Sequence, residues 1–510
     1  DPSITRLIRK RETLTSVLKS LYNLDTMKKT LLKYILFFTA CMGLSACDAL
    51  FDNELPEHDL VPENAIIDEK SAEKALLGIY SYLDDSQYNG GYLNSHLITY
   101  NYIRLNLMTA VGPSSFENDQ LYRFAYDETD ANYENGWRHV YRMINAANNV
   151  IYYVEQLGDE KFGTNRRNEI LAEARFLRAF CYMYLMQHHA QFWDTESKYG
   201  LVLRLEPSKL SLNKKARSSV SDSYKAIFDD LEFAVNNAPD YQSSYRICKT
   251  SAKAFKANYL MMRGTPADRE EALRLAEEVI ASGDFSMEEK YADIFAHKHT
   301  SPELLFTQYT DRPGGWNDNV QGLLQLLGAG KYRAKENTPD DDLSKYYTIM
   351  DNPASERYTA CMDSVILPQG KDKTFIWKKF YNLQKEAVPM YYLRVAQMYL
   401  IKAEAMSYRN YTVADVVETL NVLHSRANEE LLDAGDYSSM EEVREEIFRE
   451  YIREVGAENG DPFFYAARTM INGKRLLQEY NMYFEEDNTL CFPIPAKEIE
   501  INSLAEQNPY

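Results

Sequence analysis

Apolar residues that recur every three or four positions constrain the fold of this 510-residue chain more than any other feature. Between residues 71 and 83, one such stripe contains Ala72, Leu76, Ile79 and Leu83. This spacing places apolar side chains on one face of a helix. The same period predicts further helices over residues 137–157, 168–189, 221–235, 250–262, 269–281, 391–408, 412–428 and 440–455.

Helices of about 12–20 residues joined by short turns are typical of tetratricopeptide (TPR)-like stacking. No strict repeat is visible, so the period supports helical hairpins of this kind and no more. Residues 284–388 differ, because they are richer in Gly, Pro, Asp and aromatic residues, with Pro313-Gly314-Gly315-Trp316 as one example. We therefore predict a mainly α fold, in which TPR-like hairpins form a scaffold and a loop-rich, irregular second half bears short strands.

The start of the chain has the three parts of an export signal. After Met27 come Lys28-Lys29, an apolar run over residues 34–44, and small residues before Cys47. The run is too short to cross about 30 Å of hydrocarbon as a stable helix. Leu44-Ser45-Ala46-Cys47 has the pattern of a bacterial lipobox, so we predict cleavage before Cys47 and lipidation of that cysteine. Residues 1–26 do not fit this scheme, and we expect them to be a non-native or over-long leader.

These observations predict the domain organisation. In chain order we expect a leader (1–26), a lipoprotein signal peptide (27–46), a lipidated tether (47–65) and one body (66–510). Within the body we expect TPR-like helices (66–283 and 389–456), a loop-rich ligand-binding region (284–388) and a C-terminal extended segment (457–510).

The net charge of the chain limits the classes of partner that it is expected to bind. The chain carries 57 Lys and Arg against 76 Asp and Glu. Residues 1–46 hold eight basic and three acidic residues, so the remainder holds 49 and 73, a net charge of −24. Such a surface argues against nucleic acid and against broad adhesion to anionic lipid.

Nothing in the sequence points to a metal, a cofactor or a reaction. The cysteines after Cys47 form no CxxC and no zinc-like spacing, so we interpret them as buried apolar residues: Cys181, Cys248, Cys361 and Cys491. GxSxG, HExxH, Walker and Rossmann motifs are absent from the sequence. We predict a binding protein without a catalytic site, a metal or a cofactor.

Short motifs along the whole mature chain carry a resemblance to a known family. In chain order they are Lys74–Tyr80 (KALLGIY), Trp137 with Tyr141 and Ala147-Asn148, Ala172–Ala179 (AEARFLRA), Asp229–Glu232 (DDLE) before Pro239, Pro302–Phe306 (PELLF), Tyr392–Ala405, Leu420-Asn421 with Ser425–Ala427, and Phe492–Pro495 with Gln507–Pro509. The chain resembles the SusD/RagB family, the surface lipoproteins of Bacteroidota that capture nutrients for a TonB-dependent transporter. One stretch departs from the family pattern: residues 448–468 keep only a partial echo of it, and Asp461-Pro462 suggests a rebuilt turn.

The resemblance implies an outer-membrane location facing outward, a SusC-like TonB-dependent transporter as partner and an oligosaccharide as ligand. Asp48, Asp52 and Glu54 suit the surface-export signal of this phylum. Two alternatives stay open: an oligopeptide-binding lipoprotein of the RagB type, and a helical scaffold for the transporter that binds no ligand.

We expect the ligand to bind in two looped regions, because binding residues concentrate on loops held by a rigid scaffold. Aromatic rings offer a flat face to a sugar, and amide, carboxylate and guanidinium groups satisfy its hydroxyls. The candidates in the first loop are Tyr88, Asn89, Tyr92, Tyr100 and Asn101; those in the second are Arg312, Trp316, Asn317 and Asp318. Trp316 is the strongest single candidate.

Two arginines of the AEARFLRA segment have a structural interpretation. Arg175 and Arg178 lie on an apolar helix, and a buried arginine needs a partner. We expect Glu173 and Glu404 to pair with them in the helix seams.

Overall fold

The structure, a computed structural model, describes residues 65–83, 96–110, 120–209, 214–309, 332–334, 349–350, 352–366, 373–377 and 389–509. The chain divides into two units, Asp1–Ala65 and Ile66–Tyr510. Apart from Ala65, every described residue belongs to the second unit, and the fold below is the fold of that unit. None of the described helices is both long and apolar enough to cross a membrane.

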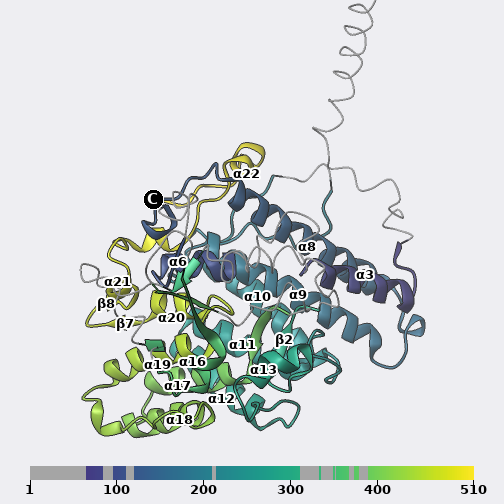
Figure 1. The fold of residues 1–510 in the computed structure, drawn as a ribbon. Coiled ribbons are helices and arrows are strands. Elements are labelled where there is room, and N and C mark those ends of the chain that lie inside the picture. The colour runs from purple at the N-terminus through teal and green to yellow at the C-terminus, as the bar shows by residue number, and fades with distance from the viewer. Residues whose placement is uncertain are drawn as a thin grey trace, which may run out of the picture. The chain divides into compact units, whose positions relative to one another are not determined.

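A helical array forms the body of this unit (Figure 1). Its main helices are α3 (Glu69–Ser81), α8 (Ala131–Gln156), α9 (Arg166–His189), α10 (Val220–Asn237), α11 (Lys249–Arg263), α12 (Pro266–Ala281), α17 (Val395–Ser407), α18 (Val413–Arg426) and α19 (Met440–Val455). Helix α9 lies between α8 and α10, and α3 covers α8 and α9. Packing then passes from α10 to α11, α12 and α17, and from α17 to α18 and α19. The mainly α fold predicted from the apolar period is confirmed.

Local chemistry explains where the helices begin and end. Gly264 takes a positive φ of 67° at the end of α11, a conformation that costs glycine little. Thr265 then caps α12 by accepting a hydrogen bond from the backbone of Asp268, and Pro266 occupies the first turn. The segment Gly264-Thr265-Pro266 therefore ends one helix and starts the next.

One predicted helix was too long. Its first residues form the strand β6 (Tyr391–Arg394), which pairs antiparallel with β2 (Leu304–Thr307) before α17 begins. Both strands are buried throughout. Their sequences therefore show neither the alternation of a half-buried strand nor the three-or-four-residue period of a helix. Their side chains pack into the helical array, where Phe306 lies 5.6 Å from both Phe176 and Tyr392, measured between ring centroids.

The remaining elements are short. Those before α17 are η2 (a π-helix, His96–Tyr100), α6 (Asn101–Arg104), η3 (Asp159–Lys161), α13 (Asp293–His297), η4 (Lys298–Thr300) and α16 (Glu356–Cys361). A four-stranded sheet contains β1 (Met108–Ala110), β3 (Tyr332–Ala334), β5 (Lys373–Trp377) and β4 (Met362–Ile366), in that order. The short strands expected in the loop-rich half are thus present.

The C-terminal segment was expected to be extended, and this expectation was wrong. It contains α20 (Asp461–Arg468), the hairpin of β7 (Met470–Ile471) and β8 (Lys474–Arg475), α21 (Leu477–Tyr480), η6 (Asp487–Leu490) and α22 (Ala496–Ile501). The short helix η5 (Ala434–Asp436) lies earlier, between α18 and α19. Asp461-Pro462, expected to form a turn, instead opens α20, because proline suits the first turn of a helix.

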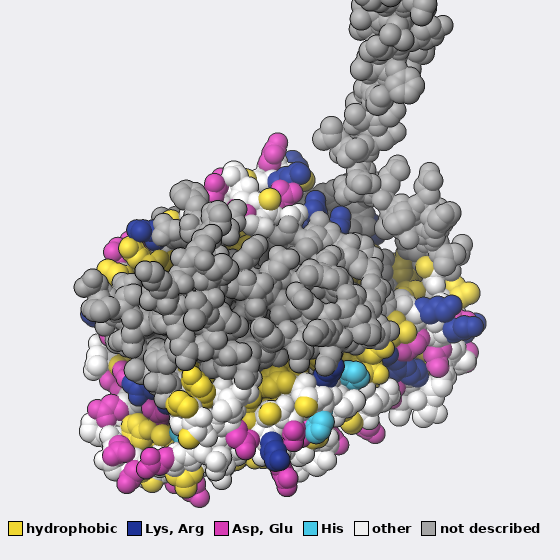
Figure 2. All heavy atoms as spheres, in the orientation of Figure 1, with side chains coloured by type: hydrophobic (Ala, Val, Ile, Leu, Met, Phe, Trp, Pro, Cys, Tyr) yellow, Lys and Arg dark blue, Asp and Glu magenta, His cyan; other side chains and the backbone are white. Residues whose placement is uncertain are grey.

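Acidic side chains are prominent on the face shown in Figure 2, over the region of α18 and α19. Exposed acidic residues of these two helices and the segment between them are Asp415, Glu418, Glu430, Asp433, Asp436 and Glu442. The described surface of this region is therefore acidic, as the composition of the whole chain predicts.

Candidate functional site

The four-stranded sheet joins the two looped regions that sequence reasoning had treated separately. Strand β1 belongs to the first region and β3 to the second, and they pair antiparallel with Met108 opposite Ala334 and Ala110 opposite Tyr332. Strands β4 and β5, also from the second region, complete the sheet. Two segments more than 200 residues apart in the sequence thus share one sheet.

An aromatic cluster lies where β2 leaves the core. The ring centroid of Tyr245 is 4.8 Å from that of Tyr309 and 6.1 Å from that of His299, and the His299 and Tyr309 rings are 6.3 Å apart. Tyr309 keeps 49% of its surface exposed, whereas Phe306, three residues earlier, is fully buried. Rings presented in this way offer flat faces to a sugar or to a peptide side chain.

Backbone hydrogen bonds hold this cluster to the core strand. The amide of Thr307 donates to the carbonyl of Ser244 at 2.9 Å, and the Ser244 hydroxyl donates to the carbonyl of His299 at 2.5 Å. The amide of Gln308 donates to the carbonyl of Met390 at the end of the paired strand. The three rings therefore project from a rigid base.

Two of the predicted ligand residues fall among the described residues. Tyr100 ends the π-helix η2, is half-buried, and meets the rings of Tyr133 and Phe492 edge-on at 6.3 and 6.1 Å. Asn101 is fully buried, and its amide donates to the carbonyl of Leu97 at 3.1 Å. Asn101 thus serves the interior and offers no atom to a ligand here, which corrects its assignment as a ligand candidate; Tyr100 remains a candidate.

The other predicted site residues lie outside the described residues. They are Cys47, Tyr88, Asn89, Tyr92, Arg312, Trp316, Asn317 and Asp318. Their roles stay predictions. The segment that contains Arg312 and Trp316 follows Tyr309 in the sequence.

Tyr245, His299 and Tyr309 are not among the ligand residues predicted from the sequence. One signal for Tyr309 was available: it follows a buried strand and precedes a Gly- and Pro-rich loop, where side chains turn outward. Nothing comparable marks Tyr245, because its position depends on the hydrogen bond between Ser244 and Thr307, which are 63 residues apart.

Buried arginines pair differently from the prediction. Arg178 forms a two-pronged ion pair with Asp230 of α10, at 2.7 and 2.8 Å, and Arg175 pairs with Glu155 at 2.8 Å. Glu173 instead accepts from Arg246, and Glu404 from Arg468. The expected partners were wrong because the seam that faces α9 at this point is formed by α8 and α10.

A second cluster of polar side chains is ionic and buried, and α19 contributes Glu454 to it. Glu454 accepts hydrogen bonds from Arg394 (3.0 Å) and from Arg426, and Arg357 lies 3.4 Å away. Glu303 of the β2 region pairs with both Arg394 and Arg426. Burial alone would raise the pKa of Glu454, but the three guanidinium groups outweigh it and hold this pKa well below its usual range.

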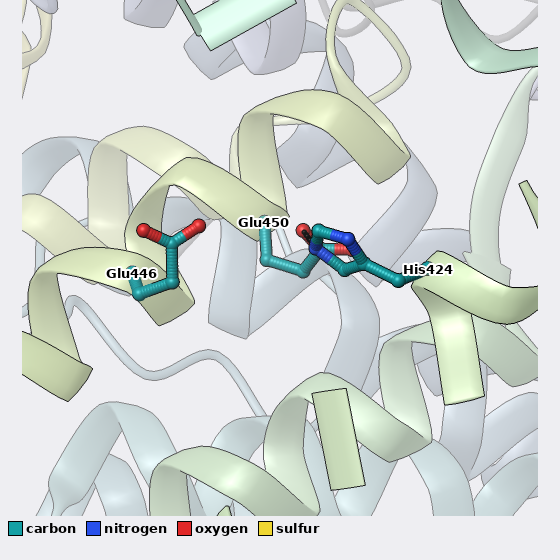
Figure 3. A group of neighbouring side chains, drawn as sticks. All are labelled: His424, Glu446 and Glu450. Atoms are coloured by element: carbon teal, nitrogen blue, oxygen red, sulfur yellow. Dashed lines mark hydrogen bonds and ion pairs between the residues drawn. The ribbon is translucent and has the colours of Figure 1, made fainter. Parts of the chain in front are cut away.

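Within this cluster, His424, Glu446 and Glu450 lie close enough to share a cation (Figure 3). A cation already lies between the two carboxylates, however: Arg453 donates to Glu446 and to Glu450, each at 2.7 Å. Glu450 also pairs with Arg357. A metal ion would have to displace these guanidinium groups, so we interpret the cluster as an ionic core that joins α16, α18 and α19.

Comparison with known proteins supports one family. A family model described as starch-binding and associating with the outer membrane matches residues 63–260, and the model of the SusD family matches residues 234–510. A SusD-like protein of Bacteroides ovatus is 23% identical over 425 residues, which are 75% of this chain and 73% of that protein.

Solved structures share the fold. A SusD superfamily protein from Bacteroides thetaiotaomicron superposes with a TM-score of 0.69 at 19% identity, covering 87% of this chain and 100% of that one. A laminarin-binding SusD-like protein superposes with a TM-score of 0.67 at 18% identity, covering the same shares. At these identities the likeness concerns the fold alone.

Proposed function

Because the chain belongs to the SusD family, we propose that it is a surface lipoprotein that captures an oligosaccharide and delivers it to a SusC-like, TonB-dependent transporter of the outer membrane. The role is reversible binding rather than catalysis. Two observations carry the proposal: one sheet unites the two looped regions, and Tyr309, half-exposed, forms a ring cluster with Tyr245 and His299.

The chemistry of the cluster suits a sugar. A pyranose presents C–H groups on its faces and hydroxyls around its edge, so aromatic rings bind the faces and polar groups bind the edge. Trp316 and Arg312, on the segment that follows Tyr309, would add a further ring and a hydrogen-bond donor. Starch and laminarin are the first ligands to test, since one matching family model is described as starch-binding and one similar structure as laminarin-binding.

The binding experiment uses the protein lacking residues 1–47. It is titrated separately with soluble starch, laminarin and a mixed oligopeptide pool, and binding is measured by calorimetry. We expect saturable binding of at least one glycan and no peptide binding. Peptide binding without a glycan signal would overturn the glycan proposal and favour an oligopeptide ligand.

The lipid anchor is a separate part of the proposal. Three acyl chains on Cys47 would hold the protein stably, whereas one chain holds a protein only marginally. Labelled palmitate should be incorporated into the wild-type chain expressed in a Bacteroidota host, and the protein should fractionate with the outer membrane. Cys47→Ala should abolish both, and unchanged labelling of that variant would exclude Cys47 as the site.

Delivery requires a partner. The acidic surface over α18 and α19 is one candidate docking face for the transporter (Figure 2). Co-purification of the lipidated protein with a TonB-dependent transporter from the native host is the direct test, and its absence after mild detergent extraction would contradict the delivery role.

A further inference from the structure

Two short helices carry the four-stranded sheet at its opposite edges. Helix α6 ends at Arg104, four residues before β1, and α16 passes directly into β4. In the order β1-β3-β5-β4, these two strands are the outer ones. Each edge of the sheet is therefore connected to the helical body through its own helix.

The four-stranded sheet has too few paired residues to be stable by itself. Among the described residues, β1 and β3 share three residue pairs and β4 and β5 share five, whereas β3 and β5 share the single pair of Ala334 and Phe375. A two-stranded ribbon is marginally stable by itself. The two halves of the sheet thus depend on how firmly α6 and α16 are held.

Arg104 holds the first edge. Its side chain is fully buried, and its guanidinium carbon lies 4.0 Å from the ring centroid of Phe463 and 4.7 Å from that of Phe492. It donates hydrogen bonds to the carbonyls of Thr489 (3.3 Å) and Leu490. Among the described residues no carboxylate pairs with it, so aromatic faces and peptide carbonyls supply its negative environment.

Further polar contacts fix the same helix to the C-terminal segment. The side-chain amide of Asn481 donates to the carbonyls of Arg104 (2.7 Å) and Tyr122 (2.8 Å), and the Tyr102 hydroxyl donates to the carbonyl of Val455. The bond from Asn481 to Arg104 fixes the backbone of α6, and the bond from Tyr102 fixes a side chain of the same helix to the end of α19.

Arg357 holds the second edge by ionic means. It is the second residue of α16, is 1% exposed, and pairs with Glu429, Glu450 and Glu454. Buried ion pairs of this kind are costly to break, because the remaining charges stay desolvated. Arg357 therefore ties α16, and with it β4, to α19.

We propose that Arg104 and Arg357 are the positioning residues of the ligand-binding sheet, each holding one edge in register for glycan binding. The glycan part of this inference rests on the proposed function; the mechanical part does not. Arg104 acts on the β1–β3 half and Arg357 on the β4–β5 half.

Hydrogen–deuterium exchange of the sheet tests the mechanical part without any ligand. We expect Arg104→Met to raise exchange at least tenfold in residues 108–110 and 332–334, and Arg357→Met to do so in residues 362–366 and 373–377. The matched control is Arg178→Met, which removes a buried arginine from the α9–α10 seam and should leave sheet exchange unchanged. If a Met variant fails to fold, the Lys variant at the same position is measured, and an intermediate rise is expected.

Titration of the same variants with laminarin and soluble starch tests the functional part. We expect at least tenfold weaker glycan binding for the Arg104 and Arg357 variants and unchanged binding for Arg178→Met. Unchanged sheet exchange in both positioning variants overturns the inference, as does a rise that equals the rise in the control. If the wild-type protein binds neither glycan, the proposed function fails for these ligands, while exchange still decides the positioning role.

Discussion

The Nε2 atom of His424 lies 3.0 Å from a carboxylate oxygen of Glu450 inside the ionic core. The other ring nitrogen of His424, Nδ1, lies 2.9 Å from the carbonyl oxygen of Glu430. Both neighbours can only accept hydrogen bonds, so both nitrogens must carry a proton. The geometry therefore indicates a charged, buried imidazolium that links the end of α18 to α19.

This arrangement predicts a pH dependence of stability. Burial lowers the pKa of His424, but the charge of Glu450 and the hydrogen bond to it outweigh burial, so the pKa is raised above its ordinary value. A raised folded-state pKa contributes stability that is fully present below about pH 6.5 and is lost as the pH rises through the folded pKa. Thermal unfolding should accordingly show a falling Tm above that pH.

His424→Gln should remove this slope and cost about 2 kcal/mol at pH 6, the size of a charge-assisted hydrogen bond. His297, whose pKa is raised by its exposed contact with Glu288, titrates in the same direction and needs its own control. The slope should persist in His297→Gln. A slope that disappears there and persists in His424→Gln would contradict the assignment.

Glu454 should be among the most sensitive carboxylates of the chain. Glu454→Gln removes the buried carboxylate that Arg394 and Arg426 share, for which we expect a loss of about 3–5 kcal/mol in the free energy of unfolding by urea titration. Because the pKa of Glu454 is lowered, its stabilisation is present at neutral pH and is lost as the pH falls through that folded pKa. Glu506→Gln, at an exposed ion pair with Lys198, should change nothing measurable.

Gly460 should not tolerate a methyl group. A Cβ there would lie 2.6 Å from Nδ2 of Asn101 and 2.9 Å from the carbonyl oxygen of Leu97. Gly460→Ala should therefore push η2 and α6 away from α20 and destabilise the protein by about 1–3 kcal/mol in urea. In contrast, Gly78→Ala in α3, where no atom lies within 4 Å, should stabilise by about 0.5–1 kcal/mol. Equal effects at the two positions would refute the steric explanation.

Tyr309 should contribute to glycan binding and little to folding. Since about half of its surface is exposed, Tyr309→Ala should weaken binding of the glycan found by calorimetry about tenfold or more, with a change in Tm of under about 2 °C. Tyr411, 39% exposed at the turn between α17 and α18, is the matched control. Loss of binding in Tyr411→Ala as well would point to a general effect on the fold.

The sequence predicted helices best where the apolar period continues over many residues. The helix expected over 168–189 is α9, Arg166–His189, and the helix expected over 440–455 is α19, Met440–Val455. The helix prediction was wrong at Tyr391–Arg394, a strand, because a stretch buried on every side has no alternation to distinguish strand from helix. The partners of Arg178 were also wrong, since a pairing across a seam depends on which helices meet there.

The candidate site divides in the same way. Aromatic and amide side chains in two looped regions could be proposed as ligand residues from their chemistry alone. The burial of Asn101 could not be predicted in this way, because burial changes between neighbours: Tyr100 is only half-buried. Nor could Tyr245 and Tyr309 be paired before Ser244 was seen beside Thr307.

The amino-acid sequence by itself determined the helical body, the acidic composition and the lipobox pattern ending at Cys47, because these depend on neighbours a few residues apart. Only the tertiary structure decided that β1 pairs with β3 and that Arg104 and Arg357 each hold one edge of their sheet. Such contacts join residues tens to hundreds of positions apart. They form when the packed core brings those segments together, and no pattern of neighbouring residues predicts which distant segments will meet.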